Sequence, residues 1–198
     1  MKKTLYLIRH GTALHNINYD TMGESAFTTT RDTPLVETGI SDAKLLNSTW
    51  KNKDKIELIL VSPLSRTLET ANIIFDNNPA PIIALDCLKE HPQSHHICNK
   101  MTDKDCLIAK YPRIDFSNIS QEDLDWSDKK LSSHMESVQI EKRVNALKEW
   151  LRNRDEKTIA IVGHNSYFNL ILYGSADYNR KTELKHCYPY EVDFYVEE

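Results

Sequence analysis

The sequence has few cysteines, and their spacing is not that of a disulfide framework. Cys87, Cys98, Cys106 and Cys187 are scattered, and no two of them form a Cys-x-x-Cys pair. Small secreted domains depend on paired cysteines, whereas cytosolic proteins keep their thiols reduced. We therefore expect free cysteines and a cytoplasmic location.

Long hydrophobic runs and an excess of positive charge are also missing. The apolar run after Lys2 and Lys3 stops at Arg9, too early for a signal-peptide core, and no segment is long enough to cross a bilayer. The 25 lysines and arginines against 29 acidic residues give a net charge of −4. We expect no membrane binding and no general attraction to nucleic acid, so any anion site must be a local cluster of cations. The sequence indicates no oligomeric state.

Repeats and low-complexity linkers are absent, and 198 residues fit one domain over residues 1–198. Short apolar runs bounded by turn residues predict buried strands. These runs lie at residues 4–8, 57–62, 81–85, 158–163 and 190–196.

Helical periodicity lies between the predicted strands. Apolar residues at spacings of three and four predict helices over 41–50, with Ser41 as N-cap, over 64–75 and over 140–151. Helices that alternate with buried strands favour an α/β fold, a three-layer α/β/α sandwich with a mostly parallel central sheet. Two segments, at about 15–38 and 91–135, are polar or weakly periodic, and we expect them to be loop insertions over the strand ends.

The first predicted strand ends on Arg9, His10 and Gly11. Open α/β sheets bind ligands at the carboxyl ends of their strands. Gly11 lets the backbone turn, or lets a ligand approach the main chain closely. A cation beside a potential nucleophile at this edge suits an anionic substrate attacked by imidazole.

Two further predicted strands end on candidate anion ligands. After the strand 57–62, Pro63 breaks the strand and Ser65 can cap a helix, so that Arg66 falls in its first turn. An arginine there opposes the helix dipole unless an anion is bound between them. The strand 158–163 is followed by His164 and Asn165. Three strands thus bring two arginines and two histidines to one edge of the sheet. The positive charge of this cluster complements the negative charge of a phosphate monoester.

Together, these segments resemble the histidine phosphatase superfamily, whose members share the phosphoglycerate mutase-like fold. The resemblance runs in the family's order across nearly the whole chain. The matching residues are Arg9-His10-Gly11, Asn16, Asp32-Thr33-Pro34-Leu35 with Thr38-Gly39, Ser62-Pro63-Leu64-Ser65-Arg66-Thr67, Leu88-Lys89-Glu90, Glu136 with Arg143, and Val162-Gly163-His164.

The resemblance implies a catalytic role for several residues and no cofactor. His10 would be the nucleophile that becomes phosphorylated, and Glu90 the proton donor to the leaving group. His15 lies near the nucleophile and is a candidate substrate contact, with a local hydrogen bond as the alternative. Phosphate and substrate binding would fall to Arg9, Arg66, His164, Asn16 and the backbone that follows His164, beginning at Asn165.

Some positions depart from the family pattern. Asn165 stands where many relatives have a small residue, and Glu90 is followed by His91-Pro92-Gln93, without the tryptophan and glycine of many bacterial members. Asp86 and Asp103 therefore stay as alternative acids. A run of histidines and cysteines over residues 91–106 has no spacing typical of a zinc site, so we expect no metal.

The resemblance favours a metal-independent phosphatase that acts on a small phosphate ester or another phosphorylated substrate. Mutases of the family resemble one another in a tryptophan-bearing segment soon after Arg-His-Gly, and residues 12–31 contain no tryptophan. A phosphomutase stays as the nearest alternative. A catalytically weak relative that only binds phosphorylated ligands is a second one, and an acid at Glu90 argues against it.

Overall fold

A six-stranded sheet forms the centre of the molecule in the computed structural model, which describes residues 2–123, 126–176 and 182–195. The strand order is β4-β3-β2-β5-β1-β6, and β6 alone among these strands runs antiparallel to its neighbour. The strands are β1 (Lys2–Arg9), β2 (Leu58–Val61), β3 (Ile82–Ala84), β4 (Ile114–Asp115), β5 (Thr158–Gly163) and β6 (Pro189–Tyr195).

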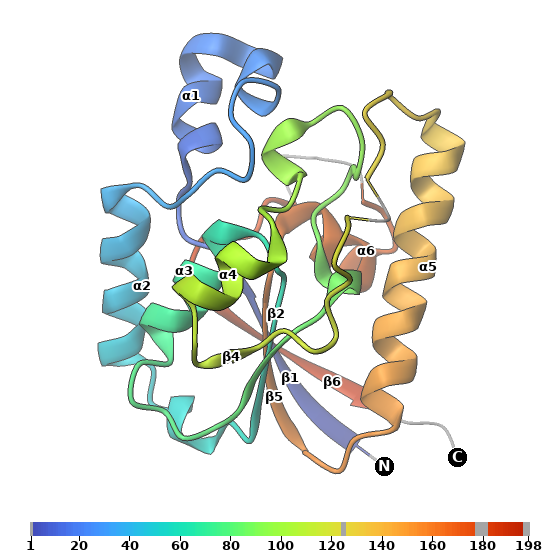
Figure 1. Ribbon diagram of the computed structural model, residues 1–198. Coiled ribbons are helices and arrows are strands. Elements are labelled where there is room, and N and C mark those ends of the chain that lie inside the picture. The colour runs from blue at the N-terminus through green and yellow to red at the C-terminus, as the bar shows by residue number, and fades with distance from the viewer. Residues whose placement is uncertain (1, 124–125, 177–181, 196–198) are drawn as a thin grey trace.

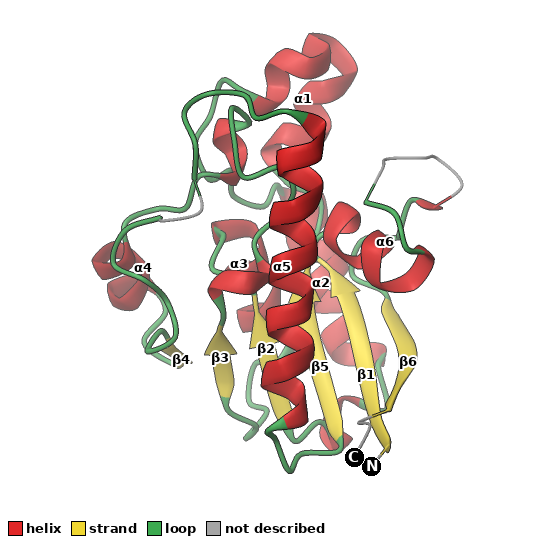
Figure 2. Cartoon of the chain, turned by 90° about the vertical axis from the view of Figure 1, so that its right-hand side faces the viewer, coloured by secondary structure: helices red, strands yellow, loops and turns green. Residues whose placement is uncertain are grey.

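Helices cover both faces of this sheet (Figure 1). Helix α5 lies in front of the strands in Figure 2, and α2 and α3 lie behind them. The predicted three-layer sandwich with a mostly parallel sheet is therefore confirmed. The α-helices in the described part of the chain are α1 (Leu14–Met22), α2 (Glu37–Thr49), α3 (Ser65–Ile74), α4 (Lys104–Lys110), α5 (Ser133–Arg152) and α6 (Asn165–Tyr173).

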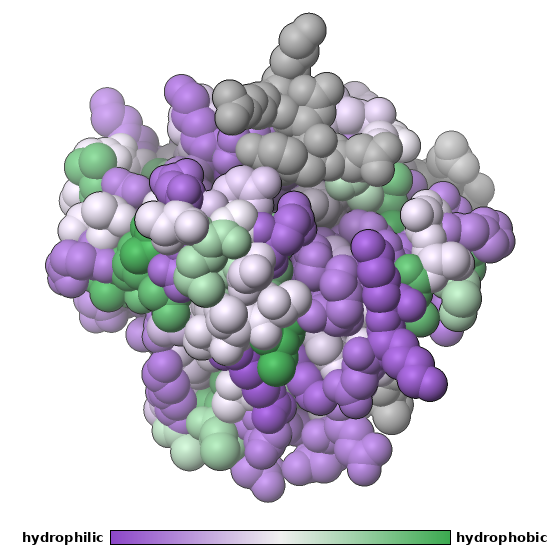
Figure 3. Space-filling model, turned by 90° about the horizontal axis from the view of Figure 1, so that it is seen from above, coloured by the Kyte–Doolittle hydropathy of each residue, from purple (hydrophilic) through white to green (hydrophobic). Residues whose placement is uncertain are grey.

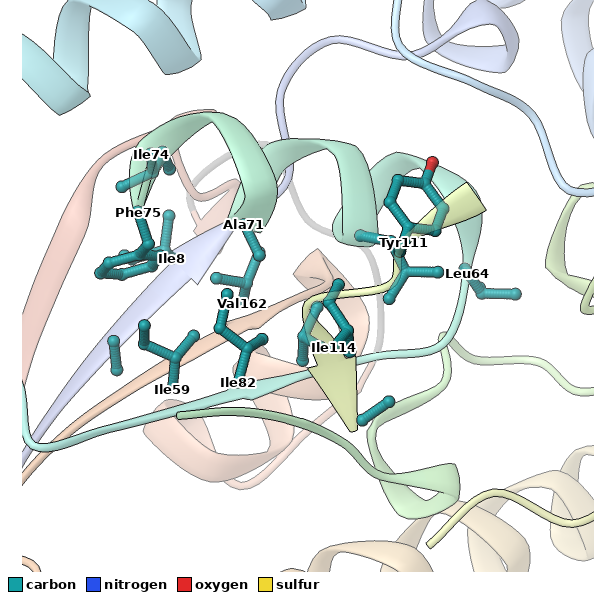
Figure 4. Close-up of a cluster of buried hydrophobic side chains, with 14 of the residues drawn as sticks. Ile8, Ile59, Leu64, Ala71, Ile74, Phe75, Ile82, Tyr111, Ile114 and Val162 are labelled. Atoms are coloured by element: carbon teal, nitrogen blue, oxygen red, sulfur yellow. The ribbon is translucent and has the colours of Figure 1, made fainter. Parts of the chain in front are cut away.

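The two hydrophobic cores follow from the alternation of side chains along the strands. Tyr6 and Ile8 of β1 belong to the cluster that packs against α2, α3 and α4. Leu5 and Leu7 belong to the cluster on the other face, against α5 and α6. Figure 4 shows the first cluster, where Phe75 and Ala71 lie over Ile59 and Val162. Because the central strands are covered on both sides, they are continuous apolar runs rather than alternating ones.

The predicted strands are confirmed with small shifts at their ends, and the strand 158–163 has the predicted bounds. Val196, the last residue of the predicted C-terminal strand, lies outside the described residues. The N-cap prediction at Ser41 is wrong, because α2 begins four residues earlier, at Glu37. The start of α2 is tied to the loop after β1, where the N–H of Val36 donates to the carbonyl of Thr12.

The two predicted loop insertions contain regular structure. Residues 14–27 form α1 and a 3-10 helix (Gly23–Phe27), and residues 91–135 contain α4 and β4. Helix α1 buries only His15, and its Ile17, Tyr19 and Met22 are exposed. Because its one buried side chain is a histidine that lines the cavity, no apolar face of this helix packs on the core. In the described residues, no helix combines the length and apolarity needed to span a membrane.

Candidate active site

The carboxyl ends of β1, β5 and β2 bring the predicted catalytic residues together. These strands are neighbours in the sheet, and all point toward the end of the molecule that carries α1 (Figure 2). The rings of His10, after β1, and His164, after β5, have centroids 5.3 Å apart. The predicted convergence of the strand ends is therefore confirmed.

Gly11 is required by close packing behind the site. A Cβ atom at Gly11 would lie 2.6 Å from the carbonyl oxygen of Gly39, and one at Gly39 would lie 2.2 Å from that of Thr12. Neither distance is possible for a real side chain. The two glycines thus let the start of α2 press against the backbone after His10, and the N–H of Gly11 donates to Thr70 Oγ1 at 3.0 Å.

The hydrogen bonds of His10 determine which of its ring nitrogens can attack. Nδ1 lies 2.7 Å from the carbonyl oxygen of Gly11. A carbonyl only accepts, so neutral His10 carries its proton on Nδ1 and has a lone pair on Nε2. Burial, followed by the charges of Arg66 and His164, holds the pKa of His10 well below its usual value. The imidazole is therefore neutral and nucleophilic at physiological pH.

Arg9 is the cation next to His10, and its orientation is fixed by residues near the C-terminal end of the chain. It is only 6% exposed, and its Nη1 donates to Glu183 Oε1 at 3.1 Å and to the carbonyl of Leu184 at 2.7 Å. Leu184 in turn donates its N–H to Asn165 Oδ1 at 2.8 Å. The segment 182–188 therefore holds both Arg9 and Asn165 in place.

Arg66 lies behind the cavity wall rather than on its surface. It is fully buried in the first turn of α3, as predicted, and donates to the carbonyl of Cys98 and to Asn99 Oδ1. Ser65 is the first residue of α3 rather than its N-cap. The N–H and the hydroxyl of Ser65 both donate to the carboxylate of Asp32, at 2.7 and 2.8 Å. Asp32, which lies outside the helix, thus provides the acceptor that an N–H group in the first turn of a helix otherwise lacks.

His164 lies behind the cavity beside His10, and the start of α6, which follows it, forms part of the cavity wall. His164 is fully buried, its Nε2 lies 2.8 Å from Ser62 Oγ, and burial followed by the charge of Arg66 lowers its pKa well below the usual value. Asn165 and Ser166 begin α6 and line the cavity. The N–H groups of a helix start favour bound anions.

Glu90 lines the same cavity as His10. Its Oε1 accepts from the N–H of His91 at 2.8 Å and of Tyr167 at 3.3 Å, and burial raises its pKa above the usual value. Arg143 of α5 donates to the carbonyls of Lys89 and Glu90, which fixes the backbone at this point. A carboxyl with a raised pKa can hold a proton for the leaving group.

The two alternative acids lie away from the cavity. Asp86 pairs with Lys89 at 2.8 Å and accepts the N–H of Ser120. Asp103 pairs with Arg31 at 3.0 Å, and its side chain is 77% exposed. Of the three carboxylates considered from the sequence, Glu90 is the one that lines the cavity with His10.

The site opens into a cavity of about 840 Å³. His15 and Asn16 of α1 line it beside His10, and His15 Nδ1 lies 2.6 Å from Thr33 Oγ1. Asn16 Oδ1 accepts the N–H of Ala13, which fixes the first turn of α1. Seen from above, this end of the molecule is mostly hydrophilic, with small separate hydrophobic patches (Figure 3).

The histidines and cysteines of residues 91–106 do not converge on one point. Within the described part of the chain, no three His, Cys, Asp or Glu side chains are grouped to hold a metal ion. His95 and His96 instead pack ring against ring, with centroids 4.3 Å apart.

His186 is a third histidine beside His10, and no pattern in the sequence indicated it. Its ring centroid lies 5.4 Å from that of His10, and its Nδ1 donates to the carbonyl of His10. It precedes β6, and an antiparallel strand begins at the edge where its parallel neighbours end. Had the direction of β6 been known, the residues before it could have been assigned to the site.

The buried histidines predict a loss of stability in mild acid. Burial lowers the pKa of His96 and His186 to about 4, and those of His10, His15 and His164 also lie well below the usual value. Below about pH 6.5 each histidine is protonated first in the unfolded chain. This lowers the free energy of unfolding by up to about 1.4 kcal/mol per pH unit for each fully buried histidine, and by less for the half-buried His96. The raised pKa of Glu90 increases the free energy of unfolding as the pH falls, but this is the effect of one group against that of five histidines.

We therefore expect the free energy of unfolding to fall from pH 7 to pH 5, measured by urea denaturation. His186→Asn should make the fall less steep, whereas His134→Asn, at an exposed position on α5, should not. A stability that is constant or rises toward pH 5 would show that these histidines are not buried as neutral groups.

Comparison with known proteins identifies the family. The model of the histidine phosphatase superfamily (branch 1) matches residues 5–188. The chain belongs to this superfamily. Phosphoglycerate mutase-like protein 1 of Arabidopsis thaliana is 28% identical over 207 residues, which cover 83% of this chain and 69% of that protein. A probable phosphatase of Schizosaccharomyces pombe is 27% identical over 169 residues, covering 82% and 74%.

Solved structures of the superfamily share the fold. A phosphoglycerate mutase from Bacillus anthracis has a TM-score of 0.60 and 18% identity, over 98% of this chain and 88% of that one. The ecdysone phosphate phosphatase of the silkworm, solved with tungstate, also has a TM-score of 0.60, with 16% identity over 96% and 87%. The predicted phosphoglycerate mutase-like fold is thus confirmed, and superfamily membership supports a phosphatase or mutase activity.

Proposed function

We propose that this histidine phosphatase superfamily member is a metal-independent phosphatase that hydrolyses a phosphate monoester through phosphohistidine at His10. The observation that carries the proposal is the Nδ1 bond of His10 to the Gly11 carbonyl, which makes Nε2 the free nucleophilic nitrogen. Arg9 and the first N–H groups of α6 lie beside it to neutralise charge on the phosphoryl oxygens.

In the first step, the lone pair of His10 Nε2 attacks phosphorus. The bond from phosphorus to the ester oxygen breaks, and that oxygen takes the electron pair together with the proton of Glu90. In the second step, water attacks phosphorus, and the carboxylate of Glu90 accepts a proton from that water. The phosphorus–nitrogen bond breaks, its electron pair returns to His10 Nε2, and phosphate is released. The raised pKa of Glu90 and the lowered pKa of His10 both favour the starting form, with Glu90 protonated and His10 neutral.

Arg66 and His164 support this centre from behind. Arg66 acts from its buried position beside Cys98 and Asn99, where its charge lowers the pKa of His10. His164, hydrogen-bonded to Ser62, lies behind the cavity beside His10.

Hydrolysis of p-nitrophenyl phosphate and of simple alkyl phosphates, followed as released phosphate between about pH 4.5 and 8, tests the proposal. We expect turnover with an acidic optimum. A phosphomutase, the activity named for several relatives, would instead move the phosphoryl group within phosphoglycerate without releasing phosphate.

We expect EDTA to leave the rate of hydrolysis unchanged, because each proposed step uses only side chains of this chain. The rate before and after prolonged dialysis against EDTA is the measurement. A rate lost on dialysis and restored by zinc would contradict the metal-independent mechanism.

A further inference from the structure

Three aromatic side chains form a continuous wall in the outer part of the cavity. Phe27 stacks on His96 with centroids 4.9 Å apart, and Tyr19 lies 5.4 Å from Phe27. All three line the cavity, and the Tyr19 side chain is 46% exposed. The core does not require these rings here, since none of them belongs to either buried cluster.

This wall continues outward from the nucleophile. The ring of His15 lies 5.9 Å from that of His10 and 6.0 Å from that of Phe27. On α1, Tyr19 follows His15 by one turn, so the two share a face of the helix. The leaving group of an ester held at His10 would therefore extend along aromatic side chains.

The same outer part of the cavity carries negative charge. Asp20 and Glu24 line it beside Tyr19, and Glu183 lines it beside Arg9. Among the described residues that line the cavity, Arg9 is the one lysine or arginine, and it is paired with Glu183. A second phosphate or a carboxylate on the leaving group would meet carboxylates there rather than cations.

We propose that the substrate is a monophosphate ester whose leaving group carries an aromatic ring and no further negative charge. The ring would pack against Tyr19, Phe27 and His96, and Asp20 and Glu24 would exclude acidic leaving groups. This inference rests on the proposed phosphatase activity and names its substrate class. It also separates the protein from an enzyme selective for phosphoglycerate, whose leaving group carries a carboxylate.

Two matched pairs of esters test the proposal in the intact protein. 2-Phenylethyl and 2-cyclohexylethyl phosphate differ in the aromatic ring, and glycerol 3-phosphate and 3-phosphoglycerate differ in the carboxylate. We expect kcat/KM to favour the aromatic over the saturated ester by about fivefold. We expect it to favour glycerol 3-phosphate over 3-phosphoglycerate by at least about fivefold.

Variants assign each preference to its residues. Tyr19→Leu, at an exposed helix position, should bring the ratio for the first pair close to one, and Phe27→Leu should act in the same direction. The double variant Asp20→Asn with Glu24→Gln should bring the ratio for glycerol 3-phosphate and 3-phosphoglycerate close to one. Asp54→Asn with Glu141→Gln makes the same change in charge at exposed positions outside the cavity lining, and should leave both ratios unchanged.

The possible failures are distinguishable. If esters are hydrolysed but the wild type shows neither preference, or the control double variant moves the ratios as much as the cavity variants do, the substrate class is wrong and the phosphatase activity stands. If no ester is hydrolysed, the proposed function fails, and the substrate class fails with it.

Discussion

Replacement of His10 with alanine is expected to lower kcat by at least about 10⁴-fold, because it removes the atom that forms the covalent intermediate. The neighbouring histidines His164 and His186 cannot replace His10 as the group that attacks phosphorus. His164 Nε2 is engaged with Ser62. His186 is oriented by the carbonyl of His10, and the charge of Arg9 lies against it.

Single-turnover and steady-state hydrolysis of p-nitrophenyl phosphate by wild type and His10→Ala measure this loss. His134→Ala is the matched control, since His134 is an exposed histidine on α5 that does not line the cavity. Unchanged thermal unfolding of His10→Ala would show that the fold is intact. A variant that keeps a substantial part of the wild-type rate would remove His10 as the nucleophile.

Glu90→Gln is expected to separate substrates by their leaving groups. Glutamine keeps the oxygen that accepts from the N–H groups of His91 and Tyr167, so the local structure is preserved. What is lost is the proton. An alkyl phosphate, whose alkoxide is a poor leaving group, should be slowed by about 10²- to 10³-fold, and p-nitrophenyl phosphate by less than about tenfold.

The comparison of kcat for the two esters in each variant is the measurement. Asp103→Asn is the control, because Asp103 was the other candidate acid downstream of Glu90 and lies exposed beside Arg31. Equal losses for the two esters in Glu90→Gln, or a loss selective for alkyl esters in Asp103→Asn, would place the proton donor elsewhere.

The sheet and the residues at its carboxyl edge could be predicted because the sequence pattern that determines each of them lies within a few consecutive residues. A buried parallel strand is a short apolar run, and the residue after it must lie at the common edge. Arg9 and His10 could therefore be placed beside His164, and Arg66 in the first turn of α3. The bonds from the guanidinium of Arg66 to the 91–99 segment could not be predicted, because they join distant parts of the chain.

The cover of the site could not be predicted for a related reason. Helix α1 covers the cavity, and none of its apolar residues belongs to either core cluster, so no core-facing pattern marks it. The contacts that tie this cover to the rest of the cavity join segments some seventy residues apart; one of them is the stacking of Phe27, in the 3-10 helix after α1, on His96. Likewise, the place of His186 depends on the antiparallel direction of β6, which an apolar run does not encode.

The covalent intermediate is the central claim, and trapping it is the most direct test. Wild-type protein would be mixed with ³²P-labelled substrate ester, quenched in alkali within one turnover, digested, and the labelled peptide sequenced by mass spectrometry. We predict one phosphoryl group on His10, stable in alkali and lost in acid, and no label in His10→Ala. A hydrolysing enzyme that carries no label under these conditions, or carries it on another residue, would contradict the mechanism.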